Sequence, residues 1–410
     1  MQLFKKKLAA TLALTLCQAM ACSTFIVPIS NSGTGKTINV VGARTLDFEV
    51  QVSSNLGHYG LTGDENYSTV DVNAQAYANA LTWKNIYNFV GRSLANENQL
   101  VDGINSAGVY AAALYLPDIT NYPLYQGSLD IPALSVFDMV NYILGMAASV
   151  DDALTQLSKV QLVLSTIYVT PTQHLAFPAH FYLVDKSGQT ATIEFIAGKM
   201  QVTRNNHVLT NSPSIRWQQD NYAQLAVNFA DHNRPIKFDG LYMNGSGYLG
   251  VPGDATPPSR YAKIQTMLAA APTAFSDLQA EYVATAILSA GAFVPIGLNP
   301  SPTLWTSKYN LARGTYEITN HIEIADITQK PAKFMLTPPS DSLYQRIYNV
   351  ATPTQSGVHA LLIRVSKDKV IDETTANKLV PGGTELTASS KAAFYADGET
   401  IQNPTYRLSN

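Results

Sequence analysis

The residue with the most distinctive chemistry in the chain is Cys22, which follows a segment typical of an export signal. A lysine cluster at residues 5–7 precedes an apolar run at 8–17, and residues 19–21 (Ala-Met-Ala) form a small-residue signal-peptidase site. Cleavage after Ala21 would make Cys22 the first residue of the exported protein. The chain has two cysteines and the other lies in the apolar run, so the exported protein would hold one thiol and no internal disulfide.

A cysteine at the amino terminus carries a nucleophile and a base on one residue. The ordinary pKa is about 8.5 for a thiol and about 7.7–8.0 for an α-amine, so the amine can accept the thiol proton near neutral pH. The protonated amine can then donate a proton to a departing amine. We therefore predict that Cys22 is the nucleophile of an amide hydrolase. Such an enzyme also needs a group that orients the amine, a cation near the sulfur and donors for the oxyanion.

Two other interpretations of Cys22 stay open, a lipid anchor and an inert thiol. A lipoprotein signal has a larger aliphatic residue three positions before the cysteine, where this chain has Ala19. The segment therefore fits signal-peptidase cleavage better than lipidation. If Cys22 were lipidated, the protein would be a lipid-anchored binding protein that keeps the fold without turnover.

Composition excludes several other classes of protein. Of the 410 residues, 46% are hydrophobic and 14% are charged, which is typical of a globular protein. A net charge of −3 without a basic cluster after the leader argues against a nucleic-acid partner. No apolar run after residue 21 approaches the length of a membrane span. The scattered histidines lack cysteine or carboxylate partners at metal-ligand spacing, so we expect no metal or cofactor.

The order of predicted elements favours an α+β protein with helices layered on antiparallel sheets. Strands at 22–29 and 37–43 form a hairpin that brings residues 44–47 beside the start of the first strand. Apolar residues at helical spacing predict helices at 261–271 and 277–290, and two helices within 131–160 that an N-cap near Ser149 separates. Further strands are predicted at residues 109–116, 180–184, 190–196, 207–210, 305–309, 315–318 and 322–327. We expect one domain over residues 22–340, and a C-terminal extension over 341–410 that packs on it or completes it.

Five blocks of sequence carry a resemblance to a known family. They are Cys22-Ser23-Thr24, Gly-Ala-Arg-Thr-Leu-Asp at 42–47, Asp-Gly-Ile-Asn-Ser-Ala-Gly at 102–108 with Ala-Leu-Tyr-Leu-Pro at 113–117, Val-Leu-Thr-Asn-Ser-Pro at 208–213, and residues 251–261. In order and spacing they resemble the choloylglycine hydrolase family of bile salt hydrolases and penicillin V acylases, over most of residues 22–330. The resemblance implies the four-layer αββα fold of N-terminal nucleophile hydrolases, without a metal or cofactor. It also suggests a homotetramer.

The resemblance also implies roles for two residues of the second strand. Asp47 matches the aspartate that holds the α-amine, and a carboxylate acceptor raises the basicity of an amine. Arg44 matches the arginine beside the nucleophilic sulfur, where a permanent cation favours the thiolate. From the residues alone, Arg44 and Asp47 could equally form a surface ion pair at a strand end.

Three further residues receive roles from the resemblance. Asn211 matches the asparagine whose side-chain amide donates to the oxyanion, and the backbone N–H of Tyr115 would be the second donor. Arg260 matches a second active-site arginine. From the residues alone, Asn211 could be a turn residue, Arg260 an exposed residue at a helix start, and Tyr115 a core aromatic.

The implied activity is hydrolysis of linear amides other than peptide bonds, in the periplasm or outside the cell. Tyr115 stands where bile salt hydrolases tend to have asparagine and penicillin V acylases tend to have tyrosine, and an aromatic ring favours an apolar or aryl acyl group. The export signal and long C-terminus resemble the Gram-negative branch, which is associated with penicillin V and long-chain N-acyl homoserine lactones. The alternative is a conjugated bile salt hydrolase.

Overall fold

The structure, a computed structural model, describes residues 21–48, 58–60, 62–68, 79–93, 100–117, 119–123, 125, 130–164, 166–170, 173–176, 178–227, 229, 236–243, 250–295, 301–321, 359–365, 370–372 and 384–385. The predicted leader up to residue 20 and the predicted strand at 322–327 lie outside the described residues. Most of the predicted C-terminal extension also lies outside them.

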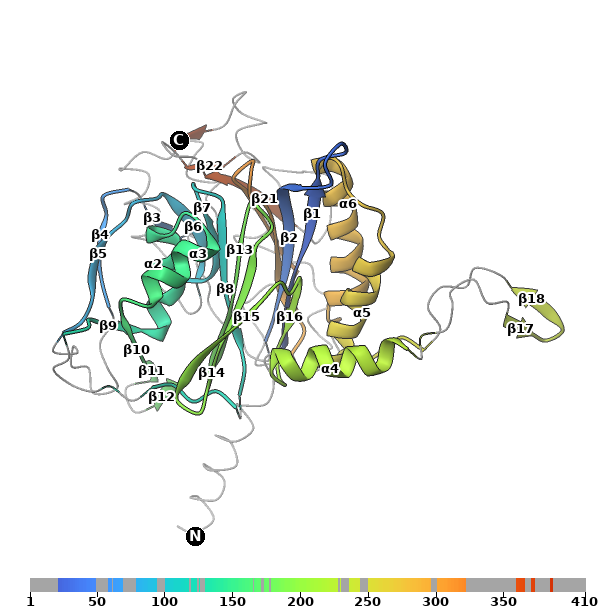
Figure 1. Ribbon diagram of the computed structural model, residues 1–410, viewed down its shortest axis with the longest axis horizontal. Helices are drawn as coiled ribbons and strands as arrows, with labels where there is room; N and C mark the ends of the chain where they lie inside the picture. The colour runs from blue at the N-terminus through green and yellow to red at the C-terminus, as the bar shows by residue number, and fades with distance from the viewer. Residues whose placement is uncertain are drawn as a thin grey trace, which may run out of the picture.

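Two antiparallel sheets form the centre of the fold (Figure 1). The larger sheet has the strand order β16 (Val208–Thr210), β1 (Ala21–Ser30), β2 (Thr37–Asp47), β19 (Thr303–Asn310), β20 (Thr315–Asn320), β21 (His359–Val365), β22 (Val370–Asp372) and β23 (Thr384–Glu385). The second sheet has the order β15 (Lys199–Arg204), β14 (Thr190–Ile196), β13 (Ala179–Asp185), β8 (Val109–Tyr115), β7 (Leu100–Asn105), β6 (Phe89–Ser93) and β3 (His58–Gly60). Strands β21–β23, from the predicted extension, continue the larger sheet.

Helices cover the outer face of each sheet, which gives four layers (Figure 1). Helices α2 (Met139–Met146) and α3 (Val150–Leu157) lie on the second sheet, and α5 (Pro257–Ala270) and α6 (Asp277–Ile287) lie on the larger sheet. One apolar core fills the space between the sheets and under α5 and α6, and a second lies beneath α2 and α3. The predicted α+β class is therefore confirmed.

Local sequence signals explain where several helices begin. The Ser149 hydroxyl accepts from the Asp152 N–H at 3.1 Å and caps α3, which confirms the predicted break. The region before it differs from the prediction, because β9 (Ala133–Ser135) and a 3₁₀ turn precede α2. Helix α4 (Ile215–Ala226) was not predicted, because its buried residues are few and leave no apolar stripe.

The register of the first hairpin places its chemical groups on two faces. Cys22 pairs with Leu46, and Thr24 pairs with Arg44. Because side chains alternate along a strand, Cys22 and Arg44 share the face toward the second sheet. Asp47 therefore projects from the opposite face, toward the helical layer. The hairpin thus presents a cation and an anion on opposite sides of one strand end.

Gly42 allows β2 to pack against an aromatic ring of β19. A Cβ atom at position 42 would lie 2.2 Å from the Tyr309 ring, whereas a Cβ at Gly253 would meet no atom within 4 Å. We expect Gly42→Ala to lower the free energy of unfolding by about 1–3 kcal/mol through overpacking. The control variant Gly253→Ala should change it by less than about 0.5 kcal/mol. Urea denaturation checks this, and equal stabilities of the two variants would contradict it.

Candidate active site

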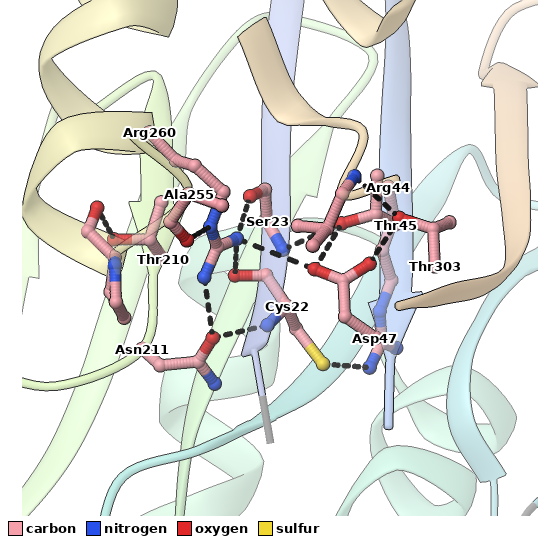
Figure 2. A network of polar contacts seen from close by, with 12 residues as sticks. Cys22, Ser23, Arg44, Thr45, Asp47, Thr210, Asn211, Ala255, Arg260 and Thr303 are labelled. Carbon is pink, nitrogen blue, oxygen red and sulfur yellow. Dashed lines mark hydrogen bonds and ion pairs between the residues drawn. The ribbon is translucent and has the colours of Figure 1, made fainter. Parts of the chain in front are cut away.

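Cys22 lies at the start of β1, completely buried between polar groups from both sheets and from α5 (Figure 2). Its Sγ atom is 3.9 Å from Nη2 of Arg44. Burial raises the pKa of the Cys22 thiol, and the charge of Arg44 acts against this effect. The sulfur therefore has one cation beside it in an environment that otherwise disfavours its ionised form.

The guanidinium of Arg44 is held by the second sheet. Nη1 donates to the Val101 carbonyl at 2.5 Å, Nη2 donates to the Ala113 carbonyl at 2.8 Å, and Nη1 lies 3.2 Å from Oδ1 of Asp102. Burial alone would lower the pKa of Arg44, but the combined effect of Asp102, Cys22 and Tyr110, with Asp102 contributing most, raises that pKa above its ordinary value. Arg44 is 1% exposed, so the surface ion-pair interpretation is wrong for this residue.

On the opposite face of β1, Arg260 of α5 contacts the backbone of the nucleophile. Its Nη1 donates to the Cys22 carbonyl at 2.8 Å and to the Ser23 hydroxyl, and its Nε donates to the Ala255 carbonyl at 3.1 Å. Pro257 and Pro258 at the helix start place Arg260 in the first turn, pointing at β1. Arg260 is completely buried, so the interpretation as an exposed helix-start residue is wrong.

The carboxylate of Asp47 has three partners on the side of the larger sheet that faces the helices. Thr303 donates to Oδ1 at 2.6 Å, Thr45 donates to Oδ2 at 3.2 Å, and Nη1 of Arg260 lies 3.5 Å from Oδ2. Burial raises the pKa of Asp47 from 3.8 to about 7, although Arg260 and both hydroxyls favour the ionised form. The site therefore holds a carboxylate that is poorly compensated while Ala21 remains attached to Cys22.

Asn211 follows β16 and contacts the backbone of the nucleophile (Figure 2). It also binds the end of β8. Its Oδ1 accepts from the Cys22 backbone N–H, and also from Nη2 of Arg260 at 3.3 Å. Its Nδ2 donates to the carbonyl of Tyr115 at 2.7 Å. From α4, Gln218 donates to the Asn211 carbonyl at 3.3 Å. Asn211 thus lies at a bend, as a turn residue would, but it is buried and connects Cys22 with Tyr115.

The structure brings the predicted residues together from distant parts of the chain. Arg44, Asn211 and Arg260 contact Cys22 directly, and so does the backbone of Asp47, which hydrogen-bonds the thiol. The Asp47 carboxylate binds Arg260. Tyr115 joins them through Asn211. The Cys22 N–H is a peptide group here, and it donates to Asn211 while the Asp47 carboxylate binds Arg260 and two threonines.

Four polar residues of the site were not singled out from the sequence. They are Ser23, Thr45, Asp102 and Thr303, and each contacts Arg44, Asp47 or Arg260. Asp102 opens one of the family-like blocks and Ser23 adjoins the nucleophile, so both had a signal in the sequence. Thr303 had none, because its role depends on the pairing of β19 with β2.

The described part of the chain contains no group of three His, Cys, Asp or Glu residues arranged to hold a metal ion. In the same part of the chain, no helix is long and apolar enough to cross a membrane.

The chain matches a known protein family over most of its length. The model of the family "Linear amide C-N hydrolases, choloylglycine hydrolase family" matches residues 32–330. A penicillin V acylase from Pectobacterium atrosepticum is 31% identical over 172 residues, which cover 42% of this chain and 41% of that protein. A bile salt hydrolase/transferase from Clostridium perfringens is 28% identical over 171 residues, or 40% and 50% of the two chains. The matches thus span half or less of these relatives.

Among solved structures, the penicillin V acylase from Agrobacterium tumefaciens has a similar fold. Its TM-score is 0.57 with 24% sequence identity, and the likeness covers 74% of this chain and 84% of that chain. The predicted four-layer fold of N-terminal nucleophile hydrolases is confirmed by this likeness together with the layers of Figure 1.

Proposed function

Because the chain belongs to the choloylglycine hydrolase family of linear amide C–N hydrolases, we propose that it is an exported acylase whose nucleophile is the thiol of Cys22. The chain is an amidohydrolase that acts on carbon–nitrogen bonds of linear amides. Cleavage after Ala21 would free the α-amine of Cys22 and so complete the catalytic residue. The single observation that supports this assignment best is that Arg44, Asn211 and Arg260 all contact Cys22, a completely buried residue.

In the proposed reaction, the Cys22 thiolate attacks the carbonyl carbon of the substrate and forms a tetrahedral oxyanion. The carbon–nitrogen bond then breaks, and the leaving nitrogen takes a proton from the Cys22 α-ammonium. The acyl group remains as a thioester on the sulfur. Water attacks the thioester and gives its proton to the α-amine, which releases a carboxylic acid and restores the thiol–amine pair.

Arg44 and Asp47 favour the charged state of this pair from opposite sides. Arg44 is 3.9 Å from the sulfur and stabilises the thiolate electrostatically. Asp47 lies on the helical side beside Arg260, which contacts the Cys22 backbone. An ammonium at Cys22 would supply positive charge that Asp47 lacks in the uncleaved chain. Removal of the leader would then activate the enzyme in the same step that creates its amine.

Asn211 and Tyr115 can together stabilise the oxyanion. A side-chain amide has two N–H donors, and the bond from Asn211 Nδ2 to the Tyr115 carbonyl uses one of them. The other can donate to the oxyanion. Because the N–H and carbonyl of a strand residue point to the same edge, the Tyr115 N–H faces the side on which Asn211 lies. Two neutral donors would thus converge without any change of protonation.

We propose penicillin V and long-chain N-acyl homoserine lactones as the substrate class, with conjugated bile salts as the alternative. Tyr115 is 4% exposed and ends β8 next to Asn211, so its position supports contact with the acyl group. The relative named as a penicillin V acylase is also slightly more similar, at 31% identity against 28% for the bile salt hydrolase/transferase.

The test is a comparison of kcat/KM for penicillin V, a long-chain N-acyl homoserine lactone and taurocholate on protein that begins at Cys22. We expect one of the first two to exceed taurocholate by about tenfold or more, a difference of about 1.4 kcal/mol in transition-state binding. Faster cleavage of taurocholate would overturn the substrate class. Failure to cleave all three would overturn the acylase proposal.

Export and processing complete the proposal. We propose that the mature protein is periplasmic or secreted, with residues 22–340 as one domain and 341–410 as its extension. Intact mass of protein purified from the native host should show a free amino-terminal Cys22. A mass increase equal to a diacylglyceryl group would contradict the mechanism, because a lipidated thiol cannot attack.

A further inference from the structure

The buried carboxylate of Asp102 connects the two sheets next to the nucleophile. Asp102 lies on β7 of the second sheet and is completely buried. Its Oδ1 is 3.2 Å from Nη1 of Arg44, and its Oδ2 accepts from the Ser307 and Tyr316 hydroxyls, each at 2.7 Å. The Tyr110 hydroxyl is a longer contact at 3.5 Å. One carboxylate therefore binds three neighbouring strands of the opposite sheet.

The sheet register shows that these contacts act on Arg44. Ser307 of β19 is the cross-strand partner of Arg44 on β2, so the two side chains lie side by side on the same face. Tyr316 projects from the next strand, β20. Asp102 thus fixes one edge of the Arg44 guanidinium, and the Val101 and Ala113 carbonyls fix its donors. The remaining contact of the guanidinium is with the sulfur of Cys22.

Charges on the face between the sheets also favour an anion at the sulfur. Two arginines lie there, Arg44 and Arg92, and the Arg92 guanidinium stacks on Trp305 at 3.8 Å. Asp102 is the one carboxylate among the described residues that contacts Arg44. On the helical side of the larger sheet, the carboxylate of Asp47 lies 3.5 Å from Nη1 of Arg260. Of these charges, the positive charge of Arg44 acts on the sulfur and favours its ionised form.

We propose that Asp102, held by Ser307 and Tyr316, is the positioning residue that keeps Arg44 against the sulfur of Cys22. The proposal rests on the proposed role of Cys22 as nucleophile. It adds that the ionisation of the thiol depends on the alignment of the two sheets at this carboxylate. Asp102 itself contacts neither the sulfur nor the substrate in this account.

Asp102→Asn separates this role from a simple effect of charge. If Arg44 stayed in place, removal of a nearby negative charge would make the surroundings of the sulfur more positive and would lower the pKa of the thiol. If Asp102 positions Arg44, its loss lets the guanidinium move away, and the pKa of the thiol rises instead. The two explanations therefore predict opposite signs.

The experiment measures the alkylation rate of Cys22 by iodoacetamide against pH, in protein that begins at Cys22 and without substrate. The processed chain has a single cysteine, so one adduct by intact mass reports this thiol. For Asp102→Asn we expect the alkylation midpoint to rise by about one pH unit, which is about tenfold slower alkylation below the midpoint. An unchanged or lower midpoint would overturn the proposal.

Two neutral variants and one matched control make the test robust. Ser307→Ala and Tyr316→Phe remove the hydroxyls that hold Asp102 without altering charge, and their double variant should also raise the midpoint. If Asp102→Asn fails to fold by circular dichroism, an unchanged midpoint in that double variant overturns the proposal. Asp185→Asn is the control, because Asp185 is also buried but binds the Val150 N–H and Ser187 away from the site. Its midpoint should match the wild type.

Hydrolysis of acyl amides by the wild-type protein is measured separately from the alkylation of Cys22. If the wild-type protein cleaves no acyl amide but Asp102→Asn raises the alkylation midpoint, the proposed function fails and the positioning role stands. If the wild-type protein is active and the midpoint is unaffected, the positioning role fails alone.

Discussion

Replacement of Cys22 with serine should lower kcat/KM for amide hydrolysis by about 10³-fold or more and leave the fold intact. A serine hydroxyl has a far higher pKa than a thiol, so neither the α-amine nor Arg44 can keep a useful fraction ionised. The serine side chain is slightly smaller. The hydrogen bonds that the Cys22 N–H donates to Asn211 and that the Cys22 carbonyl accepts from Arg260 do not involve the sulfur. Stability should therefore change little.

Steady-state kinetics with the preferred acyl amide, together with thermal melting, check this result. Thr24→Ser is the matched control, since it makes a similarly small change two residues along β1 on the same face. Its rate should stay within about twofold of the wild type, because it touches no reacting group. Wild-type rates in Cys22→Ser would rule out the thiol as nucleophile.

The second large effect is expected for Asp47→Asn, which should lower kcat by about 10²- to 10³-fold. An amide cannot stabilise the α-ammonium of Cys22 as a carboxylate does, so proton donation to the leaving group becomes less favourable. KM should change less, since Asp47 lies behind β1 and contacts Arg260, Thr45 and Thr303. Equal kcat values for the variant and the wild type would contradict the assigned role.

Asp47→Asn also has a stability signature in the chain that retains Ala21. Burial raises the pKa of Asp47 from 3.8 to about 7, so between these values the folded state keeps a proton that the unfolded state has lost. The stability contributed by this proton is complete below about pH 4 and is lost as pH rises to about 7. The stability of the wild type relative to the non-titrating variant should therefore fall over this range.

Urea denaturation of both chains at pH 4, 5.5 and 7.5 measures this difference. A wild type that gains stability over the variant as pH rises would mean that Arg260 and the two threonines depress the pKa of Asp47. The raised pKa of Asp47 also fits the proposed activation by leader removal. The new α-ammonium of Cys22 would compensate the negative charge of the Asp47 carboxylate.

Local signals in the sequence predicted the parts of the fold and site that depend on neighbouring residues. The turn at residues 31–36 and two β-branched segments predict the β1–β2 hairpin, whose register aligns Arg44 and Asp47 with the start of β1. The Pro-Pro start of α5 and the cap at Ser149 are similarly local. These features follow from backbone preferences that act within a few residues.

Features that depend on distant pairing could not be predicted in the same way. Asp102 binds Ser307 and Tyr316, which are more than 200 positions away in sequence and lie on the opposite sheet. Thr303 reaches Asp47 only because β19 pairs with β2. Helix α4 likewise has no apolar stripe that would predict it, and its Trp217 is 46% exposed.

Trapping of the acyl-enzyme tests directly whether Cys22 is the nucleophile and whether it becomes active only after cleavage behind Ala21. Protein that begins at Cys22 is mixed with excess of the acyl amide that it cleaves, quenched in acid during turnover, and digested for mass spectrometry of the amino-terminal peptide. We expect the acyl group of the substrate on Cys22 as a thioester that hydroxylamine removes, and no such adduct on protein that retains Ala21. Turnover without acylation of Cys22, or equal turnover in the chain that retains Ala21, would contradict it.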